Sequence, residues 1–118
     1  MKSSPLTEKV YVRHMLECIK RVEEFCAADE ARFGASRLIQ DAVVRNLQTL
    51  TESSQRLSDE LKATEPGIPW RGLAGFRNVL VHDYLGVDLD VVWQIVADEL
   101  PRLRAALERM EQNGEPSA

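Results

Sequence analysis

The chain has 118 residues, of which 44% are hydrophobic and 29% are charged, a composition typical of one globular domain. No apolar run approaches the length that a membrane span needs, so we expect no membrane partner. The formal net charge of -4 argues against loose, sequence-independent binding to nucleic acid, so we expect no DNA partner, and any nucleic acid that is bound must be gripped locally. The N-terminus lacks the apolar stretch of a secretory signal, which predicts a cytoplasmic protein.

The first expected helix runs from Thr7 to about Asp29, with apolar residues recurring at three- and four-residue steps. Cys18 and Cys26 both lie in this helix, roughly 12 Å apart along its axis, so they cannot bridge each other. We predict two buried thiols rather than redox or metal-binding groups. His14 has no partner at helical spacing and is predicted to lie on the surface.

The second expected helix follows a break at Gly34, with Ser36 as its N-cap, and is long, reaching about Ala63. Its apolar residues step by four and three positions in turn. A polar stripe follows the same helix at Arg45, Thr49, Glu52 and Arg56. Such a stripe is typical of a solvated or ion-paired face, and the alternative is that it lines a cleft.

The third expected helix begins at Trp70, with Pro69 placed for its first turn, and extends to about His82. Gly86 follows as a stop signal. Both Trp70 and Trp93 stand at helix starts among apolar neighbours, so core or dimer packing is a better explanation for them than stacking on bases.

The fourth expected helix is capped by Asp88 or Asp90 and extends to about Met110. Pro101 lies inside it and removes a helical hydrogen bond, which predicts a kink or a break near Leu100.

Four amphipathic helices joined by short loops predict an all-α fold, an up-and-down bundle of four main helices. We expect one domain over residues 1–118, with a frayed tail from about Gln112.

Polar residues interrupt the apolar third helix at Arg77, Asn78 and His82 and continue past it to Tyr84. At 100° per residue, Asn78 and His82 share a face, whereas Arg77 and His82 are about 140° apart. Arg77 and His82 can converge if His82 lies past the last regular turn, or if a second copy contributes across a two-fold axis.

These residue types can carry out transfer at phosphorus. An imidazole can take the proton of a ribose 2′-hydroxyl or protonate the leaving oxygen, and a guanidinium can stabilise charge on the phosphoryl oxygens. We expect no metal and no cofactor, because no close His, Cys and carboxylate pattern occurs. By spacing alone, an ion-paired Arg77, a helix-capping His82 and a partly buried Tyr84 are the commoner explanations.

The segment Arg77–Tyr84 resembles the R-x4-H-x-Y motif of HepT-like toxins in the HEPN ribonuclease superfamily. Three further segments resemble the second-helix signature, the third-helix entry and the fourth helix of that family: Asp41–Leu47, Ile68–Arg71 and Gly86–Trp93. One departure is Thr51–Ser53, where relatives often have Gly-Glu-Ala, so we expect different helix packing there.

The resemblance implies a helical homodimer in which both motif copies border one cleft. Arg77 would stabilise the scissile phosphate, His82 would be the general acid and base, and Asn78 would orient the pair. The implied reaction is metal-independent RNA cleavage by 2′-hydroxyl attack, leaving a cyclic phosphate. The implied partner is a minimal nucleotidyltransferase antitoxin (MntA-like), which adds AMP to the motif tyrosine, here Tyr84.

Two other functions compete with this one. The first is a noncatalytic HEPN dimer that serves a nucleotidyltransferase as its binding partner or substrate. The second is a helical regulator in which the motif is only structural.

Overall fold

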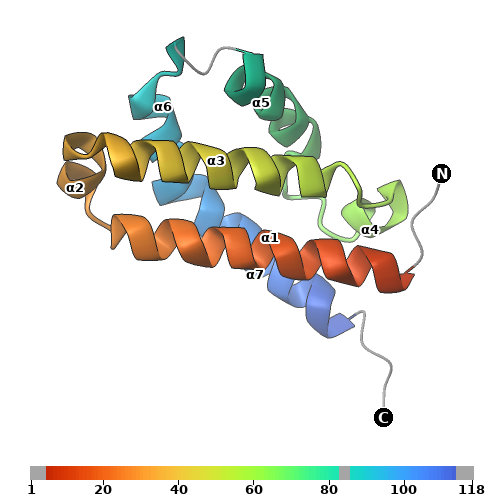
Figure 1. Cartoon of the computed structure of the whole chain (residues 1–118). Coiled ribbons are helices and arrows are strands. Elements are labelled where there is room, and N and C mark those ends of the chain that lie inside the picture. Colours follow the sequence, from red (N-terminus) through yellow and green to blue (C-terminus); the bar gives the residue numbers. More distant parts are fainter. Residues whose placement is uncertain (1–4, 83–85, 114–118) are drawn as a thin grey trace.

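The computed structural model describes residues 5–82 and 86–113, with side chains for residues 8–81 and 86–113 (Figure 1). These residues form helices and short connections without a strand, so the predicted all-α class is confirmed. No helix among them is long and apolar enough to cross a membrane. The elements in chain order are α1 (Pro5–Cys26), α2 (Glu30–Ala35), α3 (Arg37–Ser54), α4 (Asp59–Ala63), α5 (Trp70–His82), α6 (Leu89–Gln94), the π-helical segment η2 (Ile95–Glu99) and α7 (Leu100–Asn113).

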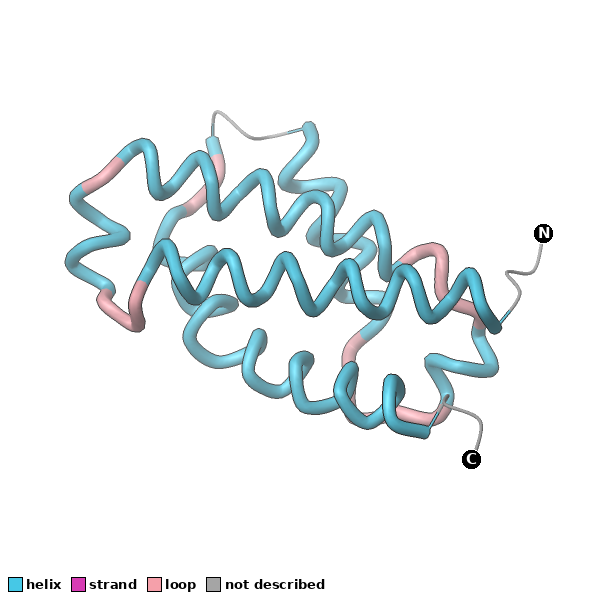
Figure 2. Tube along the Cα trace, turned by 60° about the horizontal axis from the view of Figure 1, so that its bottom comes forward, coloured by secondary structure: helices cyan, strands magenta, loops and turns pink. Residues whose placement is uncertain are grey.

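Helix α1 lies between α3 and α7, and α5 packs against α3 (Figures 1 and 2). The predicted bundle of four main helices is therefore present, with α1, α3 and α5 as three members and α6–η2–α7 as the fourth. The short helices α2 and α4, which the periodicity did not predict, lie in the connections. Because α5 is held mainly by α3, the residues of α3 decide where the motif helix sits.

The apolar face of α1 is the centre of the core. Met15, Ile19 and Val22 on α1 are fully buried, together with Leu47 on α3 and Leu107 on α7. Cys18 and Cys26 belong to the same buried face, as predicted. Burial raises the pKa of both thiols, because the protein interior disfavours the thiolate.

Helix α1 ends at Cys26, three residues earlier than expected. Ala27 and Ala28 adopt left-handed backbone conformations with φ of 48° and 54°, which no right-handed helix can continue. Asp29 then starts α2, because its side chain accepts a hydrogen bond from the Arg32 backbone N–H at 3.2 Å. The predicted extension to Asp29 was wrong because this aspartate caps the next helix.

The prediction of one long helix from Ser36 to Ala63 was also wrong. Ser36 does cap α3, but α3 ends at Ser54 and α4 begins after Ser58. The Ser58 hydroxyl accepts from the Leu61 backbone N–H at 3.1 Å, and the Ser58 N–H donates to the Glu8 carboxylate at 2.9 Å. A new cap and a contact with α1 therefore divide a segment whose apolar spacing is continuous.

The predicted irregularity near Pro101 is confirmed as the π-helical turn η2. The Leu100 N–H donates to the Ile95 carbonyl, five residues back, which widens the helix just before the proline. Pro101 then falls in the first turn of α7, where its missing N–H is tolerated. Helix α7 extends to Asn113, so Gln112 is helical rather than part of a tail. Residues 114–118 of the predicted tail lie outside the described residues.

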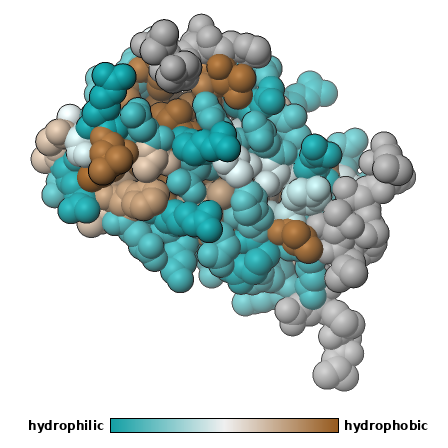
Figure 3. All heavy atoms as spheres, in the orientation of Figure 1, coloured by the Kyte–Doolittle hydropathy of each residue, from teal (hydrophilic) through white to brown (hydrophobic). Residues whose placement is uncertain are grey.

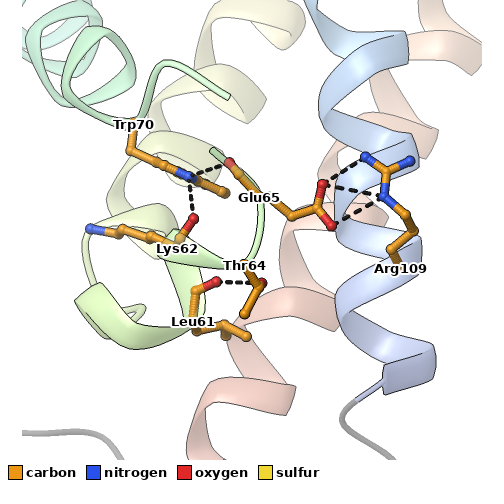
Figure 4. Close-up of polar contacts among 6 residues, drawn as sticks. All are labelled: Leu61, Lys62, Thr64, Glu65, Trp70 and Arg109. Atoms are coloured by element: carbon orange, nitrogen blue, oxygen red, sulfur yellow. Dashed lines mark hydrogen bonds and ion pairs between the residues drawn. The ribbon is translucent and has the colours of Figure 1, made fainter. Parts of the chain in front are cut away.

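The start of α5 is fixed by the loop that precedes it (Figure 4). The Trp70 indole N–H donates to the Lys62 and Glu65 carbonyls at 3.1 and 3.2 Å. The Glu65 carboxylate accepts a hydrogen bond from Arg109 Nη2 of α7 at 2.6 Å.

The second tryptophan, Trp93, lies against the Phe33 ring, with ring centroids 5.5 Å apart. Both tryptophans thus pack against the core, in line with the packing interpretation of their sequence positions.

Candidate functional site

The Arg77 guanidinium lies between α5 and α3. Its side chain is 32% exposed, and Nη2 lies 3.7 Å from the Glu52 carboxylate on α3. Nη1 donates a long hydrogen bond of 3.4 Å to the neighbouring Asn78 Oδ1. Arg77 Nε is buried and has no hydrogen-bond partner among the described residues. A buried guanidinium N–H without an acceptor is costly and uncommon, so Arg77 stands out among the described side chains.

Asn78 is exposed on α5, and His82 is the last residue of that helix. Because α5 remains helical up to His82, a non-helical turn before His82 does not bring it toward Arg77. Helical geometry therefore keeps the two residues about 140° apart around one helix. The His82 side chain, Asp83 and the predicted modification residue Tyr84 lie outside the described residues.

Helix α3 touches the motif helix at a second polar point that the sequence did not single out. Gln48 Nε2 donates a hydrogen bond to the Leu80 carbonyl at 2.9 Å. Gln48 precedes Glu52 by one helical turn, so both side chains face α5. The available signal was this four-residue spacing within the second expected helix. It could not be used without knowing that α3 lies beside α5.

The predicted polar stripe on α3 has no single role. Glu52 is ion-paired with Arg77, which agrees with the interpretation of the stripe as a solvated or ion-paired face. The Thr49 hydroxyl donates to the carbonyl of Arg45 in its own helix at 2.9 Å, and the Arg45 side chain is exposed. Glu52 is the member of the predicted stripe that contacts the motif within the described structure, and Gln48 adds a second contact. Arg56 lies beyond the end of α3.

The prediction that His14 is a surface residue was wrong. Its side chain is partly buried, and Nδ1 lies 2.8 Å from the hydroxyl of Ser53 on α3. Nε2 also lies 4.0 Å from the Cys18 sulfur. Ser53 is 39 positions away, so spacing along α1 could not reveal this partner, whereas Cys18 lies one helical turn from His14. Ser53 belongs to the segment that departs from the family pattern, and its hydroxyl joins α3 to α1.

An apolar hollow also lies beside α5. Its lining includes Leu73 and Phe76 from α5 and Leu103 from α7, with Glu99 as its one ionisable group. Such a lining offers no means of acting on a phosphate. Across the described part of the chain, no group of three or more His, Cys, Asp or Glu side chains is placed to hold a metal ion. The polar face around Arg77 is therefore the better candidate site.

An all-α bundle with an Arg, Asn and His segment at the end of its third main helix is the arrangement that the motif predicts. Residues 15–110 match the model of the family described as Ribonuclease HepT-like. The chain therefore belongs to the HepT-like ribonuclease family, and the resemblance seen in the motif is confirmed.

Three relatives illustrate the range of similarity. A "Probable ribonuclease HepT" of Thermococcus cleftensis is 34% identical over 110 residues, which cover 90% of this chain and 97% of that protein. A "Gamma-glutamylcyclotransferase and putative RNase" of Methanocaldococcus jannaschii is 35% identical over 81% of this chain but only 44% of its own length. An "mRNA nuclease HepT" of Shewanella oneidensis is 26% identical over 70% of this chain and 80% of that protein. No solved structure matches the chain significantly.

Proposed function

We propose that this chain is the toxin of a toxin–antitoxin pair and acts as a metal-independent endoribonuclease, folded as one domain over residues 1–118. Membership of a ribonuclease family supports the reaction class. The observation that carries the proposal is the state of Arg77, whose side chain is 32% exposed and whose terminal nitrogens make long contacts, a 3.4 Å hydrogen bond to Asn78 and a 3.7 Å ion pair with Glu52. An RNA phosphate supplies acceptors of the kind that this group needs.

In the proposed reaction, His82 transfers protons, and Arg77 stabilises the negative charge on the phosphate. A neutral His82 takes the proton from a ribose 2′-hydroxyl, and the 2′ oxygen attacks the adjacent phosphorus. The bond from phosphorus to the 5′ oxygen breaks, and an imidazolium protonates that oxygen. The products are a 2′,3′-cyclic phosphate and a 5′-hydroxyl. Arg77 stabilises the charge on the phosphoryl oxygens, while Asn78 orients the guanidinium through its side-chain oxygen.

A homodimer completes the site in this proposal. One helix keeps Arg77 and His82 on different faces, so a second copy is the remaining way to add groups to the same phosphate. Large apolar side chains are exposed on the elements around the motif, namely Leu38 at the start of α3, Val79 on α5, and Leu89 and Val91 on α6. Figure 3 shows apolar side chains gathered toward the end of the molecule that holds α2 and α6. Burial of these side chains would drive pairing of two copies near the cleft.

Regulation by a nucleotidyltransferase antitoxin completes the proposal. The Tyr84 hydroxyl attacks the α-phosphorus of ATP, pyrophosphate leaves, and AMP remains joined to the tyrosine oxygen. Tyr84 is two residues after His82 in the sequence, so AMP would be attached to the chain close to the proposed general base. Its negative charge and bulk would exclude an RNA phosphate from the cleft.

The decisive test is RNA cleavage by the purified full-length chain in the presence of EDTA. We expect cleavage with cyclic phosphate ends by the wild type, and loss of cleavage in Arg77→Ala and in His82→Ala. Arg102→Ala is the matched control, because Arg102 is 70% exposed and is ion-paired with Glu99, three residues before it. Undiminished cleavage in both motif variants would overturn the catalytic roles. A wild type without activity would favour the noncatalytic partner of a nucleotidyltransferase.

The modification is tested separately by intact mass after incubation with ATP and a purified MntA-like nucleotidyltransferase. We expect a mass increase corresponding to AMP in the wild type and none in Tyr84→Phe. Tyr11→Phe on α1 is the control and should gain AMP as the wild type does. If Tyr84→Phe is still modified, the acceptor is a different residue.

A further inference from the structure

Two side chains of α3 hold the motif helix at two points, one helical turn apart. Gln48 Nε2 donates to the Leu80 carbonyl at 2.9 Å, and the Glu52 carboxylate lies 3.7 Å from Arg77 Nη2. The residue number rises along α3 while the number of its contact on α5 falls, so the two helices run antiparallel here. Two such contacts restrain both the sliding and the rotation of α5 on α3.

The Gln48 contact acts on the end of α5 that carries His82. Leu80 is one of the last four residues of α5. The carbonyls at the end of a helix find no N–H donor within that helix. A side-chain amide that donates to such a carbonyl completes the hydrogen bonding of the helix end and restrains it. His82 follows Leu80 by two residues, about 3 Å along the helix axis. Loss of this bond would therefore let the backbone of His82 move relative to α3.

The Glu52 contact acts on the other proposed catalytic residue. At 3.7 Å the ion pair is too long for a hydrogen bond, so the guanidinium is attracted without losing its N–H groups to the carboxylate. Asn78 holds the opposite nitrogen, Nη1. The guanidinium is thus restrained from two sides, and donors remain for a phosphate.

We propose that Gln48 and Glu52 are positioning residues of the ribonuclease site, with Gln48 setting the place of His82 and Glu52 the orientation of Arg77. This inference rests on the proposed function. It adds two residues of α3 to a site otherwise confined to α5 and the segment after it, and neither residue contacts substrate in this scheme.

Gln48 is tested with a substitution that keeps side-chain length and removes the donor, Gln48→Met. Gln40 provides a matched control on the same helix, because its Nε2 donates to the Phe33 and Gly34 carbonyls near the end of α2, at 3.0 and 3.2 Å. Cleavage is measured on fluorescent single-stranded RNA oligonucleotides that together contain every dinucleotide step. We expect kcat to fall about 10- to 100-fold in Gln48→Met with KM nearly unchanged, and neither to change in Gln40→Met.

Amide hydrogen exchange gives a readout that does not depend on activity. Exchange in the last turn of α5 should be faster in Gln48→Met than in the wild type, and unchanged in Gln40→Met. If both glutamine variants match the wild type in exchange and in kcat, Gln48 does not position the helix end. A wild type that cleaves no RNA would overturn the proposed function alone, since hydrogen exchange would still decide the role of Gln48.

Glu52 is tested with Glu52→Gln, and Glu23→Gln is its control. Glu23 forms an exposed ion pair with Arg104 at 2.9 Å, shorter than that of Glu52 and away from the motif. We expect kcat to fall about tenfold in Glu52→Gln through the loss of guanidinium orientation. KM should fall or stay the same, because a negative charge beside the phosphate is removed. A kcat equal to or above that of the wild type would show that Glu52 only competes with RNA for Arg77, and would overturn its positioning role.

Discussion

Arg109 of α7 donates from both Nε and Nη2 to the Glu65 carboxylate in the loop before α5, with a shortest distance of 2.6 Å. This two-point ion pair joins elements that lie 44 positions apart in the sequence. It stands beside the hydrogen bonds that anchor the Trp70 indole (Figure 4). The pair therefore holds the beginning of α5, while α3 holds the rest of the motif helix.

The Glu65–Arg109 pair predicts a pH dependence of stability. The hydrogen bond from Arg109 lowers the pKa of Glu65 below its ordinary value of 4.5. A carboxyl with a lowered pKa in the folded state stabilises the fold above its unfolded pKa, and this stability is lost as the pH falls through the lowered value. We expect Glu65→Gln to unfold at lower urea concentration than the wild type at pH 7. The difference should shrink below about pH 4.5, and a constant difference at all pH values would contradict this origin.

The hydrogen bond between Ser53 and His14 predicts a stability effect of moderate size. Ser53 is 6% exposed, and its hydroxyl lies 2.8 Å from His14 Nδ1. Ser53→Ala should lower the free energy of unfolding by about 1 kcal/mol, measured by urea denaturation. Thr49→Ala is the control on the same helix, because the Thr49 hydroxyl donates to the Arg45 carbonyl of its own helix. Equal effects of the two changes would mean that the contact with α1 adds no stability.

The core predicts a much larger effect for truncation of Leu107. This side chain is fully buried on α7 against the apolar face of α1. Leu107→Ala should cost about 2–5 kcal/mol, because it removes buried apolar area and leaves a cavity. Val10→Ala on α1, where the residue is 62% exposed, should change stability by less than about 0.5 kcal/mol. Thermal and urea unfolding both report the difference.

The two cysteines predict slow thiol labelling in the folded protein. Cys18 and Cys26 are buried, and desolvation raises the pKa of each thiol, so little reactive thiolate forms at pH 8. Iodoacetamide should modify both residues slowly in buffer and rapidly in denaturant, as followed by mass spectrometry. Rapid labelling of the native protein would show that the α1 face opens.

Much of the fold could be predicted from the sequence because helix formation and burial follow local spacing. The apolar steps of α1 correctly placed its buried face and both cysteines. The rule that proline disrupts a helix correctly placed the irregularity at η2 before Pro101. The division of α3 from α4 was missed, because Ser58 acts through a cap and through Glu8, a residue 50 positions away.

For the candidate site too, local features could be predicted from the sequence and contacts between helices could not. The sequence by itself determined the motif from Arg77 to Tyr84, the helix that carries its first part and the family to which the chain belongs. Only the tertiary structure decided that Glu52 meets Arg77, that Gln48 meets the Leu80 carbonyl and that His14 meets Ser53. These pairs join different helices, and periodicity states which face of a helix is buried but not which helix covers it. Side-chain partners across a bundle are set by that packing, so they follow from the assembled fold.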